Sequence, residues 1–390
     1  MEGRVNEYLS KAPPSPLDVL FLSHMHNDHV SGLPDLLDGL KKNGGVKKAV
    51  LPYLYPSERS VILAYAYDTG PVEDWYFEFL RSPEAWLRGQ EVEEVYFVRG
   101  GDGPEGPSFE DIPPIPERPP EADHEAITSL TLEFVSQSGA SAAVQDREAS
   151  AGVEGPKQVF SSGSKLISPC WFFLLFNKEP DKQKLRCFQN KFDQLRGGRN
   201  LEAVLHEKGI QQELKKAYKS TFGEAKLNDT SLAVLSAGHL NRAPGSTSCV
   251  CFTSCLSRPI ACGPWSSPVV MCPCPCQRVW DAVRSVGVLY TGDLPVNKVW
   301  DIFSKKFGVG SNRASTCVCA YQVPHHGSKN NWHEKQAEIL RPTLVVSARA
   351  SQGVGSHPHA QVLRDIARLN RPIVWVHEQN SFRYRLEVPQ

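Results

Sequence analysis

The sequence predicts an α/β fold, because segments with strand character alternate with segments of helical periodicity along most of the chain. Short apolar runs that end in polar loops predict buried strands, and residues 19–22 and 287–290 are two such runs. Apolar residues three and four positions apart predict helices that bury one face, as at Leu33, Leu37 and Leu40. This alternation is typical of proteins in which helices pack on the faces of sheets.

The start of the chain is expected to contain two strands and two helices. After the strand at 19–22, Ser31 is a suitable N-cap for a helix, and the glycines at 44–45 are a suitable end for it. A short strand follows at 49–51, and Pro56 opens a second helix that is expected to reach about residue 67.

The rest of the chain shows the same alternation, and it contains no internal repeat. The expected strands lie at 130–135, 171–176, 232–235, 287–290, 318–323, 343–347, 373–376 and 382–388. The expected helices lie at about 181–195, 200–222 and 333–340, with two more around Trp300 and Ile366.

Composition divides the chain into three segments. Residues 1–99 and 166–390 are expected to form the two halves of one domain. Residues 100–165 are dominated by Gly, Pro, Ser, Ala and acidic residues, which predicts a flexible surface insertion. A second insertion is expected at 249–276, where seven of the eleven cysteines lie among prolines. A structural zinc site is the alternative for this segment, but its cysteine spacing matches no common zinc motif.

Length, charge and hydropathy exclude several classes of protein. The 390 residues are enough for one large domain or two ordinary ones. Lys plus Arg and Asp plus Glu number 43 each, which argues against nucleic-acid binding through net charge but leaves room for a local basic groove. No apolar run is long enough to span a membrane, and the first residues lack the apolar core of a signal peptide. We therefore expect a soluble, cytoplasmic protein with no membrane partner.

A dense cluster of metal-binding residue types follows the first predicted strand. His24, His26, Asp28 and His29 fall within six residues. Imidazole and carboxylate are the usual protein ligands of zinc and similar divalent ions. A loop of this kind can direct His24 and His26 at one metal and Asp28 and His29 at a neighbouring one. The alternative is a polar surface turn, which the density and order of these residues make improbable.

Three predicted strands in the last third of the chain also end in polar loops. These loops carry Asp293, the pair His325 and His326, and the pair His357 and His359. Functional sites of layered α/β proteins gather where strand ends meet, so we expect these loops to converge on the first histidine cluster. An aspartate at a strand end can bridge two cations, although such a residue can also be a simple turn or cap.

Two further features of these loops have open interpretations. Ser328 and Lys329 follow the histidine pair, where they can contact an anionic substrate or form part of a solvated loop. The residues around His357 can serve the site or can simply begin a helix. Gly327 is expected to permit a tight loop beside the metals.

Taken together, these motifs resemble the metallo-β-lactamase fold superfamily. The first histidine loop matches its signature, and Thr291-Gly292-Asp293 matches its bridging-aspartate motif. Within the superfamily, the tail is similar to the metallohydrolase domain of ComEC-type competence proteins and their free-standing relatives. The segments that carry this likeness are 228–232, 289–293, 323–328 and 356–359. The resemblance covers roughly residues 17–67 and 228–385 and leaves the middle of the chain unmatched.

The resemblance implies a four-layered αββα sandwich with a dinuclear site at one edge of two packed sheets. It also implies that the N-terminal strands are shortened or missing here, because few residues precede the histidine loop. The usual ligand histidine between the first loop and the bridging aspartate is not evident, since His206 and His239 match only by position. ComEC-like relatives often lack that histidine too.

The resemblance further implies two divalent metal ions, zinc or alternatively manganese, and hydrolysis by a metal-bound hydroxide. Asp28 would both bind metal and orient the hydroxide as the catalytic residue. The implied metal ligands are His24, His26, Asp28, His29, Asp293 and one or both of His325 and His326. The implied substrate-binding residues are Ser328, His357 and His359.

Three functions remain open at this point. The resemblance favours hydrolysis of a phosphodiester, with nucleic acid as a candidate substrate. The same kind of site can also hydrolyse a small ester, thioester or lactam. The third alternative is a non-catalytic metal-binding or regulatory module whose site has degraded.

Overall fold

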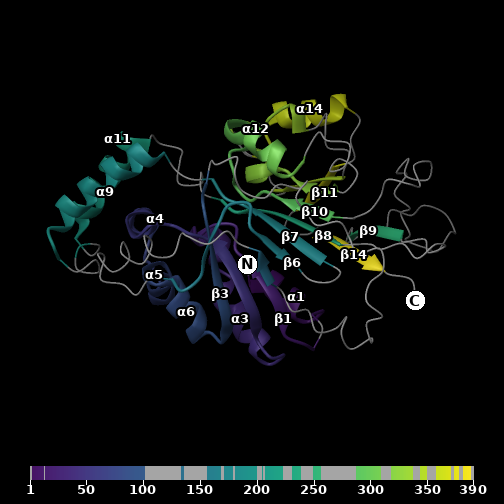
Figure 1. Ribbon diagram of the computed structural model, residues 1–390, viewed down its shortest axis with the longest axis horizontal. Helices are drawn as coiled ribbons and strands as arrows, with labels where there is room; N and C mark the ends of the chain where they lie inside the picture. Colours follow the sequence, from purple (N-terminus) through teal and green to yellow (C-terminus); the bar gives the residue numbers. More distant parts are fainter. Residues whose placement is uncertain are drawn as a thin grey trace. The chain divides into compact units, whose positions relative to one another are not determined.

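The computed structural model divides the chain into two compact units (Figure 1). The first unit comprises Met1–Gly106, Ser136–Ser164 and Phe176–Leu232, and the second comprises Pro107–Val135, Lys165–Leu175 and Ala233–Gln390. The residues that the structure describes are 2–12, 14–101, 133–135, 156–167, 171–178, 181–199, 204, 207–222, 231–238, 249–255, 287–308, 318–336, 343–348, 357–369, 373–376 and 381–387.

A parallel four-stranded sheet forms the centre of the first unit. Its strands are β1 (Leu17–Phe21), β2 (Val46–Pro52), β3 (Val92–Arg99) and β5 (Val159–Ser161), which lie in the order β1-β2-β3-β5. Phe21 is the register partner of Val50, and Val50 is the partner of Tyr96. Because all the strands are parallel, the loops that follow β1, β2 and β3 leave the sheet at the same edge.

Helices between these strands bury their apolar faces in one core with the sheet. The helices of this unit are α1 (Glu2–Leu9), α2 (Asn27–Val30), α3 (Leu33–Lys41), α4 (Pro56–Thr69), α5 (Asp74–Arg81), α6 (Pro83–Gly89), α9 (Lys182–Arg196) and α11 (Lys208–Phe222). Leu37 of α3, Phe79 of α5 and Phe188 of α9 are all fully buried in this core. Each such side chain contributes roughly 1.5–3 kcal/mol through burial. The predicted apolar face of the helix at 33–40 is thus confirmed.

An eight-stranded mixed sheet forms the centre of the second unit. Its order is β13-β12-β11-β10-β8-β7-β6-β4. The strands are β4 (Glu133–Val135), β6 (Lys165–Ile167), β7 (Trp171–Phe176), β8 (Ala233–Gly238), β10 (Gly287–Tyr290), β11 (Val318–Gln322), β12 (Thr343–Ser347) and β13 (Ile373–Val376). Strands β10 to β13 are parallel to one another, whereas β8 runs antiparallel to β10. A separate antiparallel pair joins β9 (Cys249–Cys255) to β14 (Ser381–Glu387).

Two helices pack their apolar faces in the second unit. They are α12 (Val296–Lys306), between β10 and β11, and α14 (Ala360–Arg368), between β12 and β13. The buried residues Trp300 and Phe303 of α12 and Val362 and Ile366 of α14 are those that the helical spacing predicts. The parallel strands leave the sheet at one edge, which places the loops after β10, β11 and β12 together.

The predicted α/β class is confirmed by these parallel and mixed sheets with their intervening helices. Strands at 171–176, 287–290, 343–347 and 373–376 have the predicted bounds. Of the helix predicted at 200–222, the part from Lys208 to Phe222 is confirmed, and most of residues 200–206 lie outside the described residues.

Several predictions lie outside the described residues. These concern most of the insertion at 100–165, the cysteine-rich residues after Cys255, His206, His239, the segment 228–230 and the end of the helix predicted at 333–340. The three-segment division of the chain therefore stays a prediction. In the part of the chain that the structure covers, no helix is long and apolar enough to cross a membrane.

Candidate metal site

The first histidine loop leaves the carboxyl end of β1, as the sequence predicts. The amide of Leu22 still donates to the carbonyl of Val50 at 2.9 Å, so the chain stays beside β2 just before the loop. The next residues are irregular up to His26, and α2 begins at Asn27. Asp28 and His29 therefore lie on the first turn of a short helix, whereas His24 lies in the irregular segment before it.

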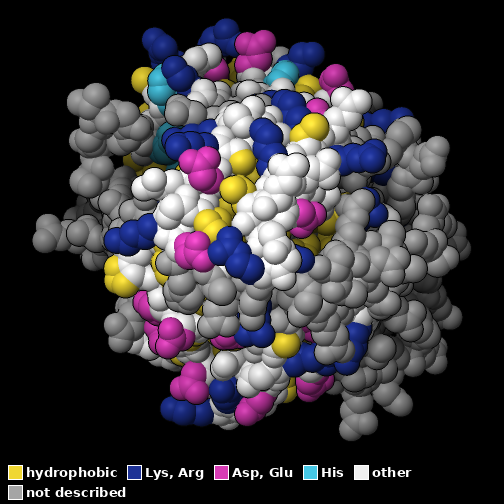
Figure 2. Space-filling view, turned by 90° about the vertical axis from the view of Figure 1, so that its left-hand side faces the viewer, with side chains coloured by type: hydrophobic (Ala, Val, Ile, Leu, Met, Phe, Trp, Pro, Cys, Tyr) yellow, Lys and Arg dark blue, Asp and Glu magenta, His cyan; other side chains and the backbone are white. Residues whose placement is uncertain are grey.

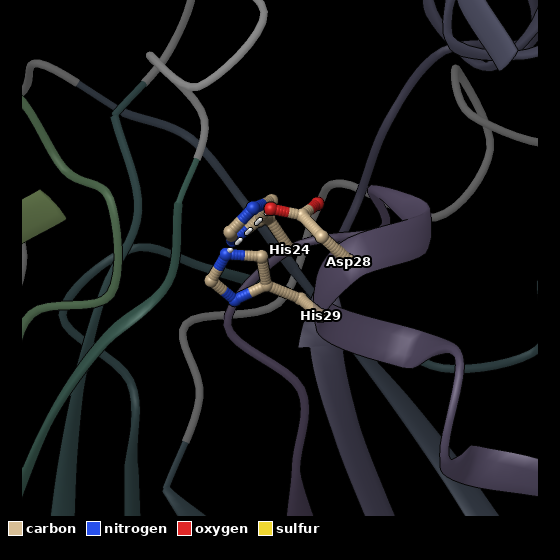
Figure 3. A group of neighbouring side chains, drawn as sticks. All are labelled: His24, Asp28 and His29. Atoms are coloured by element: carbon tan, nitrogen blue, oxygen red, sulfur yellow. Dashed lines mark ion pairs between the residues drawn. The ribbon is translucent and has the colours of Figure 1, made fainter. Parts of the chain in front are cut away.

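Three residues of this loop bring their donor atoms together (Figure 3). His24, Asp28 and His29, which we call the His24 cluster, each offer one ligand atom, and these atoms lie within 4.8 Å of one another. The imidazole centroids of His24 and His29 are 3.7 Å apart. Nε2 of His29 lies 3.6 Å from Oδ2 of Asp28.

The His24 cluster has a buried side and an exposed side. His24 is only 3% exposed, whereas the side chain of Asp28 is 74% exposed and that of His29 is 20% exposed. Oγ of Ser23 lies 3.2 Å from Nδ1 of His24. The buried imidazole is thus held by the protein, while the carboxylate faces solvent and is accessible to water and to a substrate.

His26 is close to this cluster but is not one of the three grouped residues. Its ring centroid lies 5.0 Å from that of His24, and the two rings meet edge to face. The predicted ligand role of His26 stays a prediction.

A buried tyrosine supports the loop from α5. The hydroxyl of Tyr76 donates to the carbonyl of Met25 at 3.0 Å, and both side chains are almost completely buried. Burial, and secondarily the charge of Asp28, raises the pKa of Tyr76, so the hydroxyl keeps its proton. Met25 lies between His24 and His26, and this hydrogen bond therefore fixes the backbone from which both imidazoles project. Sequence reasoning missed Tyr76 because it lies 51 residues beyond Met25.

A second cluster lies at the carboxyl edge of the parallel strands in the second unit. Asp293 follows β10, and His325 and His326 follow β11; we call these three residues the His325 cluster. Asp293 is only 4% exposed, and its Oδ2 lies 3.7 Å from Nε2 of His325. The amide of His325 donates to the carbonyl of Gly292 at 2.9 Å, which ties the two loops together.

Asn331 determines which ring nitrogen of His325 carries the proton. Its Nδ2 donates to the carbonyl of Asp293 at 2.8 Å, and because a carbonyl only accepts, this bond fixes the orientation of the amide. Its Oδ1 therefore accepts from Nδ1 of His325 at 3.1 Å. Nε2 of His325 is left with a free electron pair on the side of Asp293 when the imidazole is neutral.

The same reasoning applies to His326. Its Nδ1 lies 2.6 Å from the carbonyl of Ser347 at the end of β12, so Nδ1 donates and Nε2 is left as the possible ligand atom. The sequence leaves the choice between His325 and His326 open, and the structure gives both of them a ligand-type tautomer.

The loop that carries these histidines has unusual backbone angles. His325 and His326 have φ values of +46° and +55°, which are uncommon for residues other than glycine. Gly327 follows with φ +85°, and a Cβ atom there would lie 2.5 Å from Cβ of Pro358. The predicted need for glycine is therefore confirmed. Strained residues of this kind persist where the surrounding structure enforces them, and they concentrate at functional sites.

The residues predicted to bind substrate have different surroundings. The ring centroid of His357 lies 5.6 Å from that of His325, and burial, followed by His325 and His326, lowers the pKa of His357. Nδ1 of His359 instead accepts from the amide of Gln361 and caps α14. Oγ of Ser328 is 3.3 Å from the amide of Asn330, and this serine is buried. The substrate-binding roles of these residues stay predictions.

The donor chemistry of each cluster suits a divalent metal. In each cluster a histidine Nε2 faces an aspartate Oδ2, at 3.6 Å for His29 and Asp28 and at 3.7 Å for His325 and Asp293. Two such electron-pair donors repel each other unless a proton or a metal cation lies between them. Zinc bonds to nitrogen and oxygen of about 2.0–2.2 Å place two ligand atoms of one ion within about 4 Å of each other. The His24 cluster belongs to the first unit and the His325 cluster to the second. The predicted dinuclear centre draws on both and stays a prediction.

Comparison with known proteins adds one match. A family model described as the metallo-beta-lactamase superfamily matches residues 2–125, a segment that contains the whole His24 cluster. No curated protein and no solved structure matches the chain. The particular likeness to ComEC-type proteins therefore stays a prediction. The match supports the metallo-β-lactamase superfamily and, with the donor sets above, indicates a metal-dependent hydrolase.

Proposed function

We propose that this protein is a metal-dependent hydrolase that cleaves phosphodiester bonds. The observation that carries the proposal is the His24 cluster, in which two imidazoles and one carboxylate have donor atoms within 4.8 Å of one another. The cluster lies on a segment that matches the family model of the metallo-beta-lactamase superfamily. The choice of a phosphodiester rests on the resemblance of the C-terminal motifs to ComEC-type metallohydrolases.

The residues of the cluster have distinct roles in this proposal. A divalent metal, when bound, supplies a Lewis acid and makes bound water more acidic. His24, which is buried, would hold the metal from that side. Asp28, which is exposed, accepts a hydrogen bond from the attacking water through a carboxylate oxygen and takes up its proton. His29, 3.6 Å from Asp28, completes the set and restricts the carboxylate.

The substrate class is tested by a parallel assay of three chromogenic compounds. Protein loaded with zinc or manganese is incubated with bis(p-nitrophenyl) phosphate, p-nitrophenyl acetate and nitrocefin. We expect cleavage of the phosphodiester, which a chelator stops and added metal restores. Cleavage of the ester or the lactam alone overturns the choice of substrate.

The role of Asp28 is tested by substitution. Asp28→Asn is expected to lower phosphodiester turnover at least ~100-fold, because general acid–base groups contribute roughly 10²–10⁴ in rate. The matched control is Asp38→Asn, which removes an exposed carboxylate from α3 that lies 3.8 Å from Nζ of Lys41. Turnover by the Asp38 variant is expected to equal that of wild type. Equal turnover in both variants would remove Asp28 from the mechanism.

A further inference from the structure

We infer that the helical hairpin α9–α11 is a binding surface for the phosphate backbone of a nucleic acid. The inference deepens the proposed function, since it makes the phosphodiester part of a polymer. It rests on the charge of the two helices, on their burial pattern and on the points where the segment joins the sheet of the first unit.

The two helices are strongly basic although the chain as a whole is neutral. Together α9 and α11 carry nine Lys or Arg residues and two acidic residues. Glu213 of this pair is already occupied by Lys216, whose Nζ lies 2.7 Å from its carboxylate. A surplus of basic side chains on one supersecondary element creates the local positive field that polyanions require.

Four basic side chains of the hairpin are exposed and form no ion pair with any described residue. They are Lys184, Arg186, Lys191 and Lys208. Lys184 and Lys191 lie seven residues apart on one side of α9, which is about 10 Å along the helix. Nζ of Lys191 donates to Oγ of Ser220 at 3.2 Å, so this side of α9 faces α11. Figure 2 displays the side of the molecule on which α9 and α11 lie, with basic side chains at its surface among acidic and apolar ones.

The apolar faces of the hairpin are used inside the protein. The rings of Phe188 and Tyr218 are 5.6 Å apart, those of Tyr218 and Phe222 are 4.7 Å apart, and all three residues are buried. Tyr218 also contacts Tyr65 of α4, with the ring centroids 6.4 Å apart. The exposed large hydrophobic residues of the described chain are Tyr8, Tyr290 and Ile373, and none of them is on the hairpin. Helices that lie on membranes insert an apolar face, so these features favour a nucleic acid over a lipid surface.

The hairpin segment is attached to the edge of the sheet that carries the His24 cluster. At its start, Nδ2 of Asn177 donates to the carbonyl of Val98 near the end of β3 at 2.8 Å. At its end, the amide of Leu232 donates to the carbonyl of Ser23 at 2.7 Å, directly beside His24. Tyr65, whose ring contacts Tyr218 of α11, lies nine residues after Pro56, the first residue of α4. This spacing corresponds to about 14 Å along the helix. The hairpin and the His24 cluster therefore belong to one unit and are joined through this segment, so in this inference an oligonucleotide held by the hairpin extends to the cluster.

The test measures binding of a fluorescein-labelled 20-nucleotide single-stranded DNA by anisotropy. Chelator is present so that no cleavage occurs, and salt is varied from about 50 to 300 mM. The test variant is Lys184→Gln, Arg186→Gln and Lys191→Gln combined. The control variant removes three exposed basic residues elsewhere in the first unit, by Lys11→Gln, Lys42→Gln and Arg81→Gln. Circular dichroism and thermal unfolding establish that both variants remain folded.

We expect wild type and the control to bind alike. The hairpin variant is expected to bind at least ~10-fold more weakly at 50 mM salt, and its salt slope is expected to fall by about 2, because each phosphate contact contributes about 0.7 to the slope for single strands. Equal binding by the two variants, or no binding of DNA by wild type, overturns the inference. Binding to vesicles that contain phosphatidylserine is measured in parallel. If the hairpin substitutions weaken binding to these vesicles but leave DNA binding unchanged, the surface is a membrane site and the inference is overturned.

A second readout separates this inference from the proposed function. Turnover of bis(p-nitrophenyl) phosphate by the hairpin variant is expected to equal that of wild type, because this compound has a single phosphodiester group and no polymer backbone for the hairpin to bind. If the variant loses DNA binding and wild type cleaves no phosphodiester, the proposed function fails and the binding surface stands. If wild type cleaves the small compound and all proteins bind DNA equally, the function stands and the surface fails.

Discussion

Replacing Asn331 by alanine removes two hydrogen bonds that organise the His325 cluster. The bond from Nδ2 to the carbonyl of Asp293 is 2.8 Å long and buried, and its loss leaves a buried carbonyl without this donor. Such a loss costs about 1–3 kcal/mol, and the bond to the partly exposed His325 adds less because water can replace it. We therefore expect Asn331→Ala to lower the free energy of unfolding by about 2 kcal/mol.

The same change is expected to weaken metal binding. Without Oδ1 of Asn331, Nδ1 of His325 loses the acceptor that fixes the tautomer and the ring orientation. Loss of such a partner typically costs 10–100-fold in metal affinity, or about 1.4–2.7 kcal/mol. Competition with a chromophoric chelator measures the affinity, and urea unfolding of the metal-free protein measures the stability.

The adjacent residue provides the control for both measurements. Asn330 is exposed, and its main-chain amide donates to Oγ of Ser328, a hydrogen bond that alanine retains. Asn330→Ala is expected to change stability by less than about 0.5 kcal/mol, as surface substitutions do. If Asn331→Ala behaves like Asn330→Ala in both assays, the assigned tautomer and the supporting role of Asn331 are wrong.

Two further predictions concern Tyr76 and His333. Tyr76→Phe removes the donor to the carbonyl of Met25, so we expect the free energy of unfolding to fall by about 1–3 kcal/mol. We also expect weaker zinc binding in competition with a chelator. Unchanged zinc affinity would contradict the role of Tyr76 in supporting the loop. His333 stacks on Trp300 with ring centroids 4.8 Å apart, and burial, followed by Lys335, lowers the pKa of His333. The unfolded chain therefore binds more protons near pH 6.5 than the folded one, and stability falls as the pH drops through this value. In urea unfolding at pH 7.5 and 5.5, His333→Phe is expected to lose less stability than wild type; an equal loss would refute the shift.

Many of the strands and the histidine loops could be predicted because they depend on local sequence, although strands β3, β5, β6 and β9 were not predicted. In the apolar run 287–290 the first three residues are buried, and a polar loop after such a run marks a strand end. The parallel strands β10 and β11 then bring Asp293 and His325 to one edge, as the sequence predicts. The tight turn at Gly327 follows from the same local logic.

The supporting residues could not be predicted because they depend on tertiary contacts. Asn331 lies in a loop of polar residues, and no periodicity distinguishes it from the exposed Asn330 beside it. Tyr76 appears in the sequence as one aromatic residue of a helix face, and only the folded chain shows its hydroxyl at the carbonyl of Met25. The predicted role of His359 was equally open, since an imidazole before a helix can bind substrate or cap the helix, and its contact with the amide of Gln361 is a cap.

The central claim, that the His24 cluster binds a divalent metal, is tested most directly by the metal content of the purified protein. Wild type and His24→Ala are dialysed against the same zinc-containing buffer, freed of loose metal and analysed by plasma mass spectrometry, with circular dichroism as the check on folding. We predict at least one tightly bound equivalent in wild type and one equivalent fewer in folded His24→Ala. Equal metal content in the two proteins, or less than one equivalent in folded wild type, would contradict the claim.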